Sequence, residues 1–140
     1  MDNADRKIFL DTNVLVYAYS NTEVEKKAIV LPLLEDEWVC LSTQVINEFV
    51  WVMNKKFSVP MDSLRHIVKN LFGLYHVSIV TDATIIKAMD MSSQLNFPYW
   101  DSLIVASALE TGCDILFTED LQHGQVIENR LTVRNPFLAT

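Results

Sequence analysis

The sequence contains few of the residues that form linkers, crosslinks or membrane spans. Three glycines and four prolines in 140 residues leave no segment with the composition of a linker or a low-complexity tail. The two cysteines, Cys40 and Cys113, are too few for a disulfide framework and stand in apolar sequence, so we expect small core residues. No apolar run approaches the roughly 20 residues that a membrane span needs, and the polar segment 1–7 has no secretion pattern. We therefore expect a cytoplasmic protein with no membrane partner.

Basic residues are also scarce. Eleven Lys and Arg stand against eighteen Asp and Glu, which gives a net charge of −7. This balance argues against general nucleic-acid binding through a broad basic face. It is compatible with an enzyme that gathers its negative charge in one cleft, where divalent cations offset it. Half of the residues are hydrophobic, and the length suits one compact unit, so we expect a single domain over residues 1–140.

Short apolar segments alternate with helical patterns along the chain. The patterns predict strands at 7–10, 38–41, 76–80, 114–118 and 131–135. They predict helices at 13–19, 22–37, 43–57, 62–72, 82–95 and 99–112, with Ser42 or Thr43 as the cap of the third helix and Gly112 as the end of the last. Strands of this length that alternate with helices indicate an α/β fold with a parallel sheet covered on both faces.

Four acidic residues are expected to converge at one edge of this sheet. Asp11 ends the first strand, and Asp120 follows the strand at 114–118 after one intervening residue. Carboxyl ends of parallel strands meet at one edge, where ligands bind in a crevice. Asp101 begins the helix that feeds the same strand, and Glu48 lies about one and a half turns into the helix after the second strand. Both are therefore expected near that edge.

Each acid also has a purely structural interpretation. Asp11 can cap a helix, and Asp101 can interact favourably with the dipole at the start of its helix. Asp120 can be an ordinary turn residue and Glu48 a surface residue. Four carboxylates held together, however, repel one another and raise their proton affinities unless a cation intervenes. An all-oxygen set without His or Cys suits Mg²⁺ or Mn²⁺ rather than zinc. The predicted chemistry is metal-assisted attack of water on a phosphodiester, with one or two ions.

Four segments carry a resemblance to a known family. "IFLDTNVLVY" at 8–17, "STQVINEF" at 42–49, "YWDSLIVASALETGCDILFTEDLQHG" at 99–124 and "VRNPF" at 133–137 resemble the PIN-domain nucleases, most closely the VapC-like toxins of prokaryotic toxin–antitoxin pairs. The resemblance implies a three-layer α/β/α sandwich with a central parallel sheet of four or five strands. It also implies a metal-dependent endoribonuclease that uses Mg²⁺ or Mn²⁺, acts on RNA, forms a homodimer and is inhibited by a small cognate antitoxin.

The resemblance assigns roles to individual residues. The catalytic and metal-binding set is Asp11, Glu48, Asp101 and Asp120, with Asp11 and Asp101 as the most direct ligands. The polar neighbours that orient those carboxylates or the attacking water are Thr12, Asn13 and Thr118. Glu119 competes with Asp120 for the last position, and we favour Asp120 because it matches the family. Trp100 and His123 are candidates for substrate contact, although each also suits a structural or surface role.

Two alternative functions compete with this interpretation. A phosphotransferase of the haloacid-dehalogenase kind also begins with an apolar strand that ends in Asp, but it needs a second Asp two positions later, where this chain has Asn13. A non-catalytic module with the PIN fold, which binds RNA or takes part in assembly, is the other alternative. The complete set of four acids disfavours it. The sequence leaves the RNA target and the identity of the antitoxin open.

Overall fold

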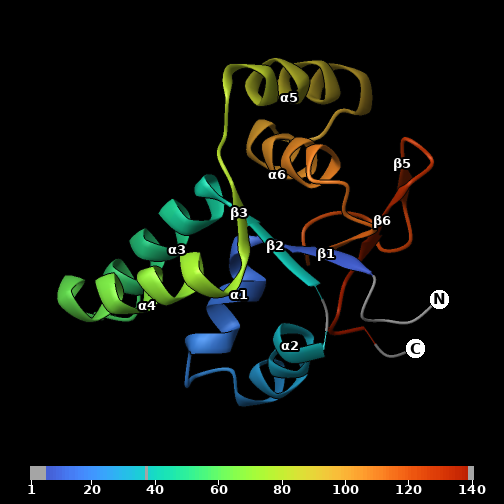
Figure 1. The fold of residues 1–140 in the computed structure, drawn as a ribbon. Helices are drawn as coiled ribbons and strands as arrows, with labels where there is room; N and C mark the ends of the chain where they lie inside the picture. Colours follow the sequence, from blue (N-terminus) through green and yellow to red (C-terminus); the bar gives the residue numbers. More distant parts are fainter. Residues whose placement is uncertain (1–5, 37, 139–140) are drawn as a thin grey trace.

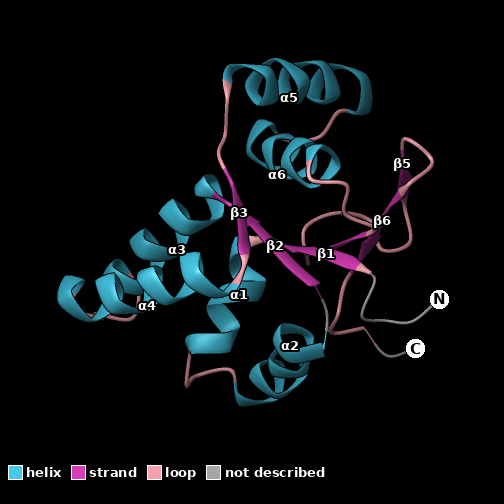
Figure 2. Ribbon diagram, viewed as in Figure 1, coloured by secondary structure: helices cyan, strands magenta, loops and turns pink. Residues whose placement is uncertain are grey.

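A mostly parallel sheet with helices on both faces forms the centre of the computed structural model, which describes residues 6–36 and 38–138 (Figure 1, Figure 2). The described residues form six strands in the order β3-β2-β1-β4-β6-β5. The strands are β1 (Lys7–Leu10), β2 (Trp38–Ser42), β3 (His76–Ser78), β4 (Ile115–Phe117), β5 (Val126–Ile127) and β6 (Leu131–Arg134). All pair in parallel except β5, which runs antiparallel to β6. The predicted α/β fold with a parallel sheet of four or five short strands is confirmed, and five of the strands pair in parallel.

Six helices cover this sheet in the described part of the chain. They are α1 (Thr12–Tyr19), α2 (Val24–Asp36), α3 (Thr43–Lys55), α4 (Met61–Leu74), α5 (Asp82–Leu95) and α6 (Tyr99–Glu110). Figure 1 shows α5 and α6 together on one side of the sheet and α2 on the opposite side, with α3 and α4 paired near β3. Residue 37, the predicted end of the second helix, and residues 1–5 lie outside the described residues. None of the described helices has the length and apolar character needed to cross a membrane.

Two of the apolar runs in the sequence, in β1 and α6, correspond to segments that are covered on more than one side. Ile8, Phe9 and Leu10 of β1 are completely buried, because β1 lies between β2 and β4 and both faces of the sheet are covered. Residues 102–109 of α6 are likewise all buried, since α6 packs between the sheet and α5. This double burial explains why neither segment has the alternating or one-sided apolar pattern of a surface element.

The helix ends follow the local chemistry of the sequence. Ser42 caps α3, and its hydroxyl accepts a hydrogen bond from the Val45 N–H at 3.3 Å. The helix α6 ends at Glu110 with Thr111 as its C-cap, and Gly112 follows with φ +72°, a left-handed conformation that glycine adopts without strain. Both ends agree with the sequence-based expectation, although α3 ends at Lys55 rather than at residue 57.

The antiparallel edge strand β5 was not predicted. It has only two residues, and its hairpin turns through Glu128 and Asn129, both with positive φ, while the Arg130 N–H donates to the Ile127 carbonyl at 3.2 Å. Positive φ at both central residues is the geometry of a type I′ turn, which usually contains glycine. Because this turn has none and the strand is so short, the sequence gives no hairpin signal.

The order of the strands places a crevice beside β1. The chain moves from β1 outward through β2 to β3 and then crosses to β4 on the other side of β1. In open parallel sheets the reversal of strand order separates the loops at the carboxyl ends, and ligands bind there. The loops after β1 and β4 flank this switch point, so the residues that follow Leu10 and Phe117 are the ones positioned for function.

Candidate active site

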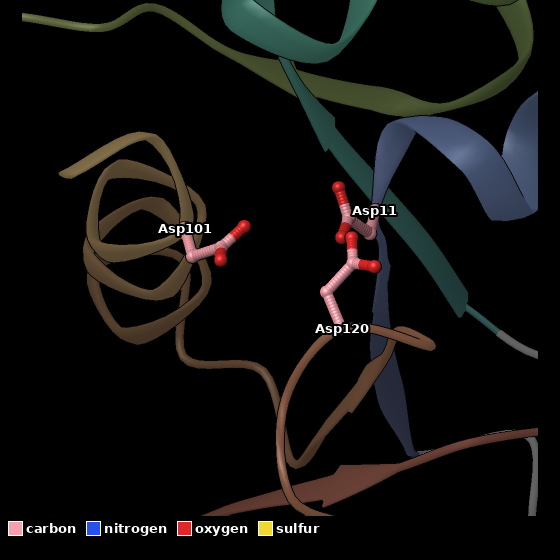
Figure 3. A group of neighbouring side chains, drawn as sticks. All are labelled: Asp11, Asp101 and Asp120. Carbon is pink, nitrogen blue, oxygen red and sulfur yellow. The ribbon is translucent and has the colours of Figure 1, made fainter. Parts of the chain in front are cut away.

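Three aspartates from distant parts of the chain meet at this switch point. Asp11 follows β1, Asp101 lies in the first turn of α6, and Asp120 lies in the loop after β4. One carboxylate oxygen of each lies within 4.8 Å of the others. Figure 3 shows Asp101 pointing out of α6 toward Asp11 and Asp120. Glu48 lines the same cavity of about 100 Å³, but it is not part of the group of three.

Asp11 serves both as a helix cap and as the most buried carboxylate of the cluster. Its Oδ1 accepts a hydrogen bond from the Thr12 N–H at 2.7 Å, so it is the N-cap of α1. Its Oδ2 accepts from the Thr118 hydroxyl, also at 2.7 Å. The side chain is 8% exposed. The structural and functional interpretations of Asp11 are therefore compatible, because capping occupies one oxygen and fixes the direction of the other.

Thr118 connects two of the aspartates. Its hydroxyl donates to Asp11 Oδ2 and accepts a hydrogen bond from the Asp120 N–H at 3.1 Å. Thr118 is completely buried, and its own N–H donates to the Arg134 carbonyl at 3.0 Å, which continues the β4–β6 ladder. A single threonine thus sets the orientation of one carboxylate and the position of the loop that carries another, which is how supporting residues hold a ligand set in place.

Burial and mutual charge raise the pKa of three carboxylates in this cavity, those of Asp11, Asp101 and Glu48. Burial raises the pKa of Asp11 to about 6, against the lowering effect of its hydrogen bonds from Thr118 and Thr12, and the charges of Asp120 and Asp101 raise it further. Burial, and then the charge of Asp120, raise the pKa of Asp101. Burial also raises the pKa of Glu48. A divalent cation would reverse these shifts, since an opposite charge favours the ionised form.

The raised pKa of Asp11 makes the stability of the metal-free protein pH-dependent. Between pH about 4 and 6 the folded protein binds more protons than the unfolded chain, because the pKa of Asp11 rises on folding from 3.8 to about 6. The free energy of unfolding therefore falls as the pH rises through this window, by about 3 kcal/mol in total from Asp11. Urea unfolding in EDTA from pH 4 to 7 measures it, and the fall should be smaller by that amount in Asp11→Asn. Parallel curves for the two proteins would contradict the assignment.

Two further residues that line the cavity each have a buried oxygen atom without a hydrogen-bond partner among the described residues. The two atoms are Thr12 Oγ1 and Gln44 Oε1, and both residues are at least nine-tenths buried. Both side chains lie beside Glu48 and favour its charged form, although neither oxygen forms a well-directed hydrogen bond with a described residue. The amide group of Gln44 donates to the Trp100 carbonyl at 3.2 Å, which ties α3 to the start of α6.

Gln44 was missed in the sequence. It stands four residues before Glu48 in α3, so both lie on the same helical face, and this spacing was the available signal. Among the other predicted residues, Asn13 and Trp100 line the acidic cavity, and Trp100 is 66% exposed. His123 does not line it. Its ring lies in a neighbouring cavity, where Nδ1 accepts from the Asn135 N–H at 3.0 Å.

Glu119 points away from the cluster, into contacts with α1 and α2. Its carboxylate accepts hydrogen bonds from the Tyr17 hydroxyl at 2.6 Å and from Lys26 Nζ at 2.7 Å. Partial burial raises the pKa of Glu119, but the hydrogen bonds from Lys26 and Tyr17, and then the charge of Lys26, hold it below its usual value. Because Glu119 is engaged on this side, its neighbour Asp120 is the acid of the pair that faces Asp11 and Asp101.

The fold and the site define an α/β protein with a carboxylate cluster at the switch point of its sheet. Residues 8–128 match the model of the PIN domain, and the chain therefore belongs to the PIN domain family. The match covers the three aspartates and Glu48. No match was found among the curated proteins.

Several solved structures share the fold over nearly the whole chain. A VapC20 toxin of Mycobacterium tuberculosis that cleaves the sarcin-ricin loop superposes with a TM-score of 0.67 at 17% identity, over 81% of this chain and 91% of that one. VapBC2 of Rickettsia felis, bound to promoter DNA, gives 0.64 at 16%, over 91% and 98%. A toxin–antitoxin complex from Klebsiella pneumoniae gives 0.69 at 16%, over 93% and 98%. At such identities the similarity establishes the fold.

Proposed function

We propose that this protein is a divalent-metal-dependent endoribonuclease and the toxin of a toxin–antitoxin pair. The observation that carries the proposal is the convergence of Asp11, Asp101 and Asp120 within 4.8 Å at the sheet's switch point. Membership of the PIN domain family supports nuclease chemistry. The similar solved structures include a toxin that cleaves an RNA loop and toxin–antitoxin complexes, which supports RNA as the substrate and an antitoxin as the partner.

The donor set fits Mg²⁺ or Mn²⁺. The three aspartates offer carboxylate oxygens, and Thr12 Oγ1 and Gln44 Oε1 are buried oxygens that make no hydrogen bond with a described residue. Hard divalent cations and their waters prefer such oxygen ligands, and no His or Cys lines this cavity among the described residues. When bound, the cation supplies a Lewis acid that polarises a phosphoryl oxygen and lowers the pKa of water.

The residues around the cavity have different roles in the proposed reaction. Asp11, Asp101 and Asp120 hold the cation, and Thr118 keeps Asp11 and the Asp120 loop in register through its two hydrogen bonds. Glu48 stands outside the group of three, and burial makes it a stronger base than an exposed glutamate, so its carboxylate takes the proton of the attacking water. Asn13 and Trp100, at the exposed rim, contact the RNA chain that enters.

Catalysis is favoured over a binding or assembly role because the electrostatic cost of the cluster has no structural purpose. Three neighbouring carboxylates, one of them 8% exposed, destabilise a protein that only binds. We also propose that the protein forms a homodimer through exposed apolar side chains such as Trp51, which is 65% exposed. Its site of action in this proposal is the cytoplasm.

Expression of the chain alone in bacteria tests the proposal. We expect growth arrest together with a defined set of new RNA ends, which sequencing of 5′ ends detects. The Asp101→Asn variant, expressed at the same level, should produce neither. Co-expression of a cognate antitoxin should restore growth. Identical RNA ends in cells that express the parent and the variant would contradict the proposed function.

A further inference from the structure

A second cavity lies at the same edge of the sheet, between the ends of β4 and β6 and the helix α2. Its volume is about 460 Å³. Its polar lining consists of His123, Arg134 and Asn135, and its walls include apolar residues such as Leu33 and Pro136. No acidic residue lines it among the side chains that the structure describes. In a chain with a net charge of −7, this is an unusual environment. We call it the donor cavity.

Every polar side chain of the donor cavity is left with hydrogen-bond donors. His123 Nδ1 accepts from the Asn135 N–H at 3.0 Å, so in the neutral ring the proton sits on Nε2. Asn135 Oδ1 accepts from the Phe137 N–H at 3.0 Å, and the amide NH₂ donates to no described residue. The guanidinium of Arg134 is exposed, carries only donors and makes no ion pair or hydrogen bond with a described residue. Such a set selects an anion.

The donor cavity and the acidic cavity are held by the same backbone. Thr118 and Asp120 of the acidic site and His123 of the donor cavity belong to the one loop after β4. In the sheet, Phe117 is in register with Leu10 on one side and with Arg134 on the other. Since neighbouring strands lie about 4.8 Å apart, the ends of β1 and β6 are separated by about 10 Å. A chain of nucleotides that crosses this edge can reach both.

We propose that the donor cavity binds a backbone phosphate of the substrate RNA, next to the phosphodiester that is cut, with the attached nucleoside against the apolar wall. The inference rests on the proposed function. A polyanion that approaches a cluster of carboxylates needs cations that hold it in place. Lys26 also lies beside this loop, but Glu119 engages it at 2.7 Å. Arg134 remains available, and its planar fork matches two phosphate oxygens.

Equilibrium binding of a short single-stranded RNA tests this assignment. The Asp101→Asn protein serves as the background, so that the RNA is not cut, and binding is followed by fluorescence anisotropy from 50 to 300 mM NaCl. Adding Arg134→Gln should weaken binding about tenfold and make the slope of log K against log salt shallower by about 0.7, the value for one phosphate contact on a single strand. Arg134→Lys should keep the slope but lose part of the affinity, because it keeps the charge without the fork.

Arg130→Gln is the matched control. Arg130 is also exposed, but it precedes β6 and therefore lies at the opposite edge of the sheet. Equal affinities and slopes for Arg134→Gln and Arg130→Gln would overturn the inference. The inference would also be overturned if a glutamate-rich peptide bound in an Arg134-dependent way while RNA binding did not depend on Arg134. The cavity would then be a site for a protein partner.

Steady-state cleavage by proteins with an intact acidic site tests the proposed nuclease function and the proposed phosphate site separately. If the parent cleaves RNA and Arg134→Gln raises KM several-fold with little change in kcat, both proposals hold. If the parent cleaves and Arg134→Gln leaves KM unchanged, only the donor cavity is wrongly assigned. If the parent cleaves no RNA but the binding assay still depends on Arg134, the proposed function fails and the phosphate site stands.

Discussion

The Asp101→Asn variant is expected to cleave RNA at least about 10³-fold more slowly than the parent. Asp101 offers one of the three oxygens that lie within 4.8 Å, and an amide in its place cannot supply the negative charge that holds a divalent cation. Loss of a cation that supplies several kcal/mol of transition-state stabilisation corresponds to a factor of this size. Single-turnover cleavage of a labelled RNA in Mn²⁺ buffer measures it.

Two further variants make this measurement specific. Asp90→Asn removes the same charge from an exposed position on α5 and should leave the rate unchanged. Glu48→Gln should also lose activity, and its pH profile should lose the limb that reports a general base, because Glu48 lies outside the group of three. Cleavage by Asp101→Asn at the parental rate would show that the cluster is not the catalytic site.

Divalent cations are expected to stabilise the folded protein strongly. Mg²⁺ or Mn²⁺ that binds only the folded state at 100 times its Kd adds about 2.7 kcal/mol to the free energy of unfolding. For a domain of this size, that raises the Tm by about 8 °C. The shift should largely disappear in the double variant Asp11→Asn and Asp101→Asn. In EDTA, the same double variant should melt at a higher temperature than the parent, because it removes carboxylates that burial and mutual charge destabilise.

The control for this second prediction is a double variant with the same change in net charge. Asp62→Asn with Asp90→Asn removes two exposed carboxylates from α4 and α5, away from the site. It should keep the full stabilisation by Mn²⁺ at constant ionic strength. Equal Tm shifts in the parent and both double variants would indicate unspecific ion effects rather than a site.

The part of the site that comes from strand ends could be predicted because two patterns coincide there. The apolar run of β1 requires burial on both faces, and the first polar residue after it, Asp11, must lie at the carboxyl edge. The same argument places Asp120 after β4. Helix register then brings Asp101 to that edge. These positions depend on local periodicity and on the parallel topology, both of which the sequence carries.

Other features depend on contacts between distant segments and could not be predicted. Glu119 and Asp120 differ in role because Lys26 of α2, 93 positions earlier, engages Glu119. The tautomer of His123 is set by a backbone N–H twelve residues later. The edge strand β5 depends on a turn in which Glu128 and Asn129 adopt positive φ without glycine. Each is decided by tertiary packing rather than by local propensity.

The most direct test of the proposed divalent-cation site is crystallographic. Crystals of the parent soaked in Mn²⁺ should give a strong anomalous difference peak in contact with carboxylate oxygens of Asp11 and Asp101, in the cavity that Thr12 and Gln44 also line. The peak should be absent from crystals of Asp101→Asn treated in the same way. An empty cavity in the parent, or a peak of equal height in the variant, would contradict a metal centre built from these side chains.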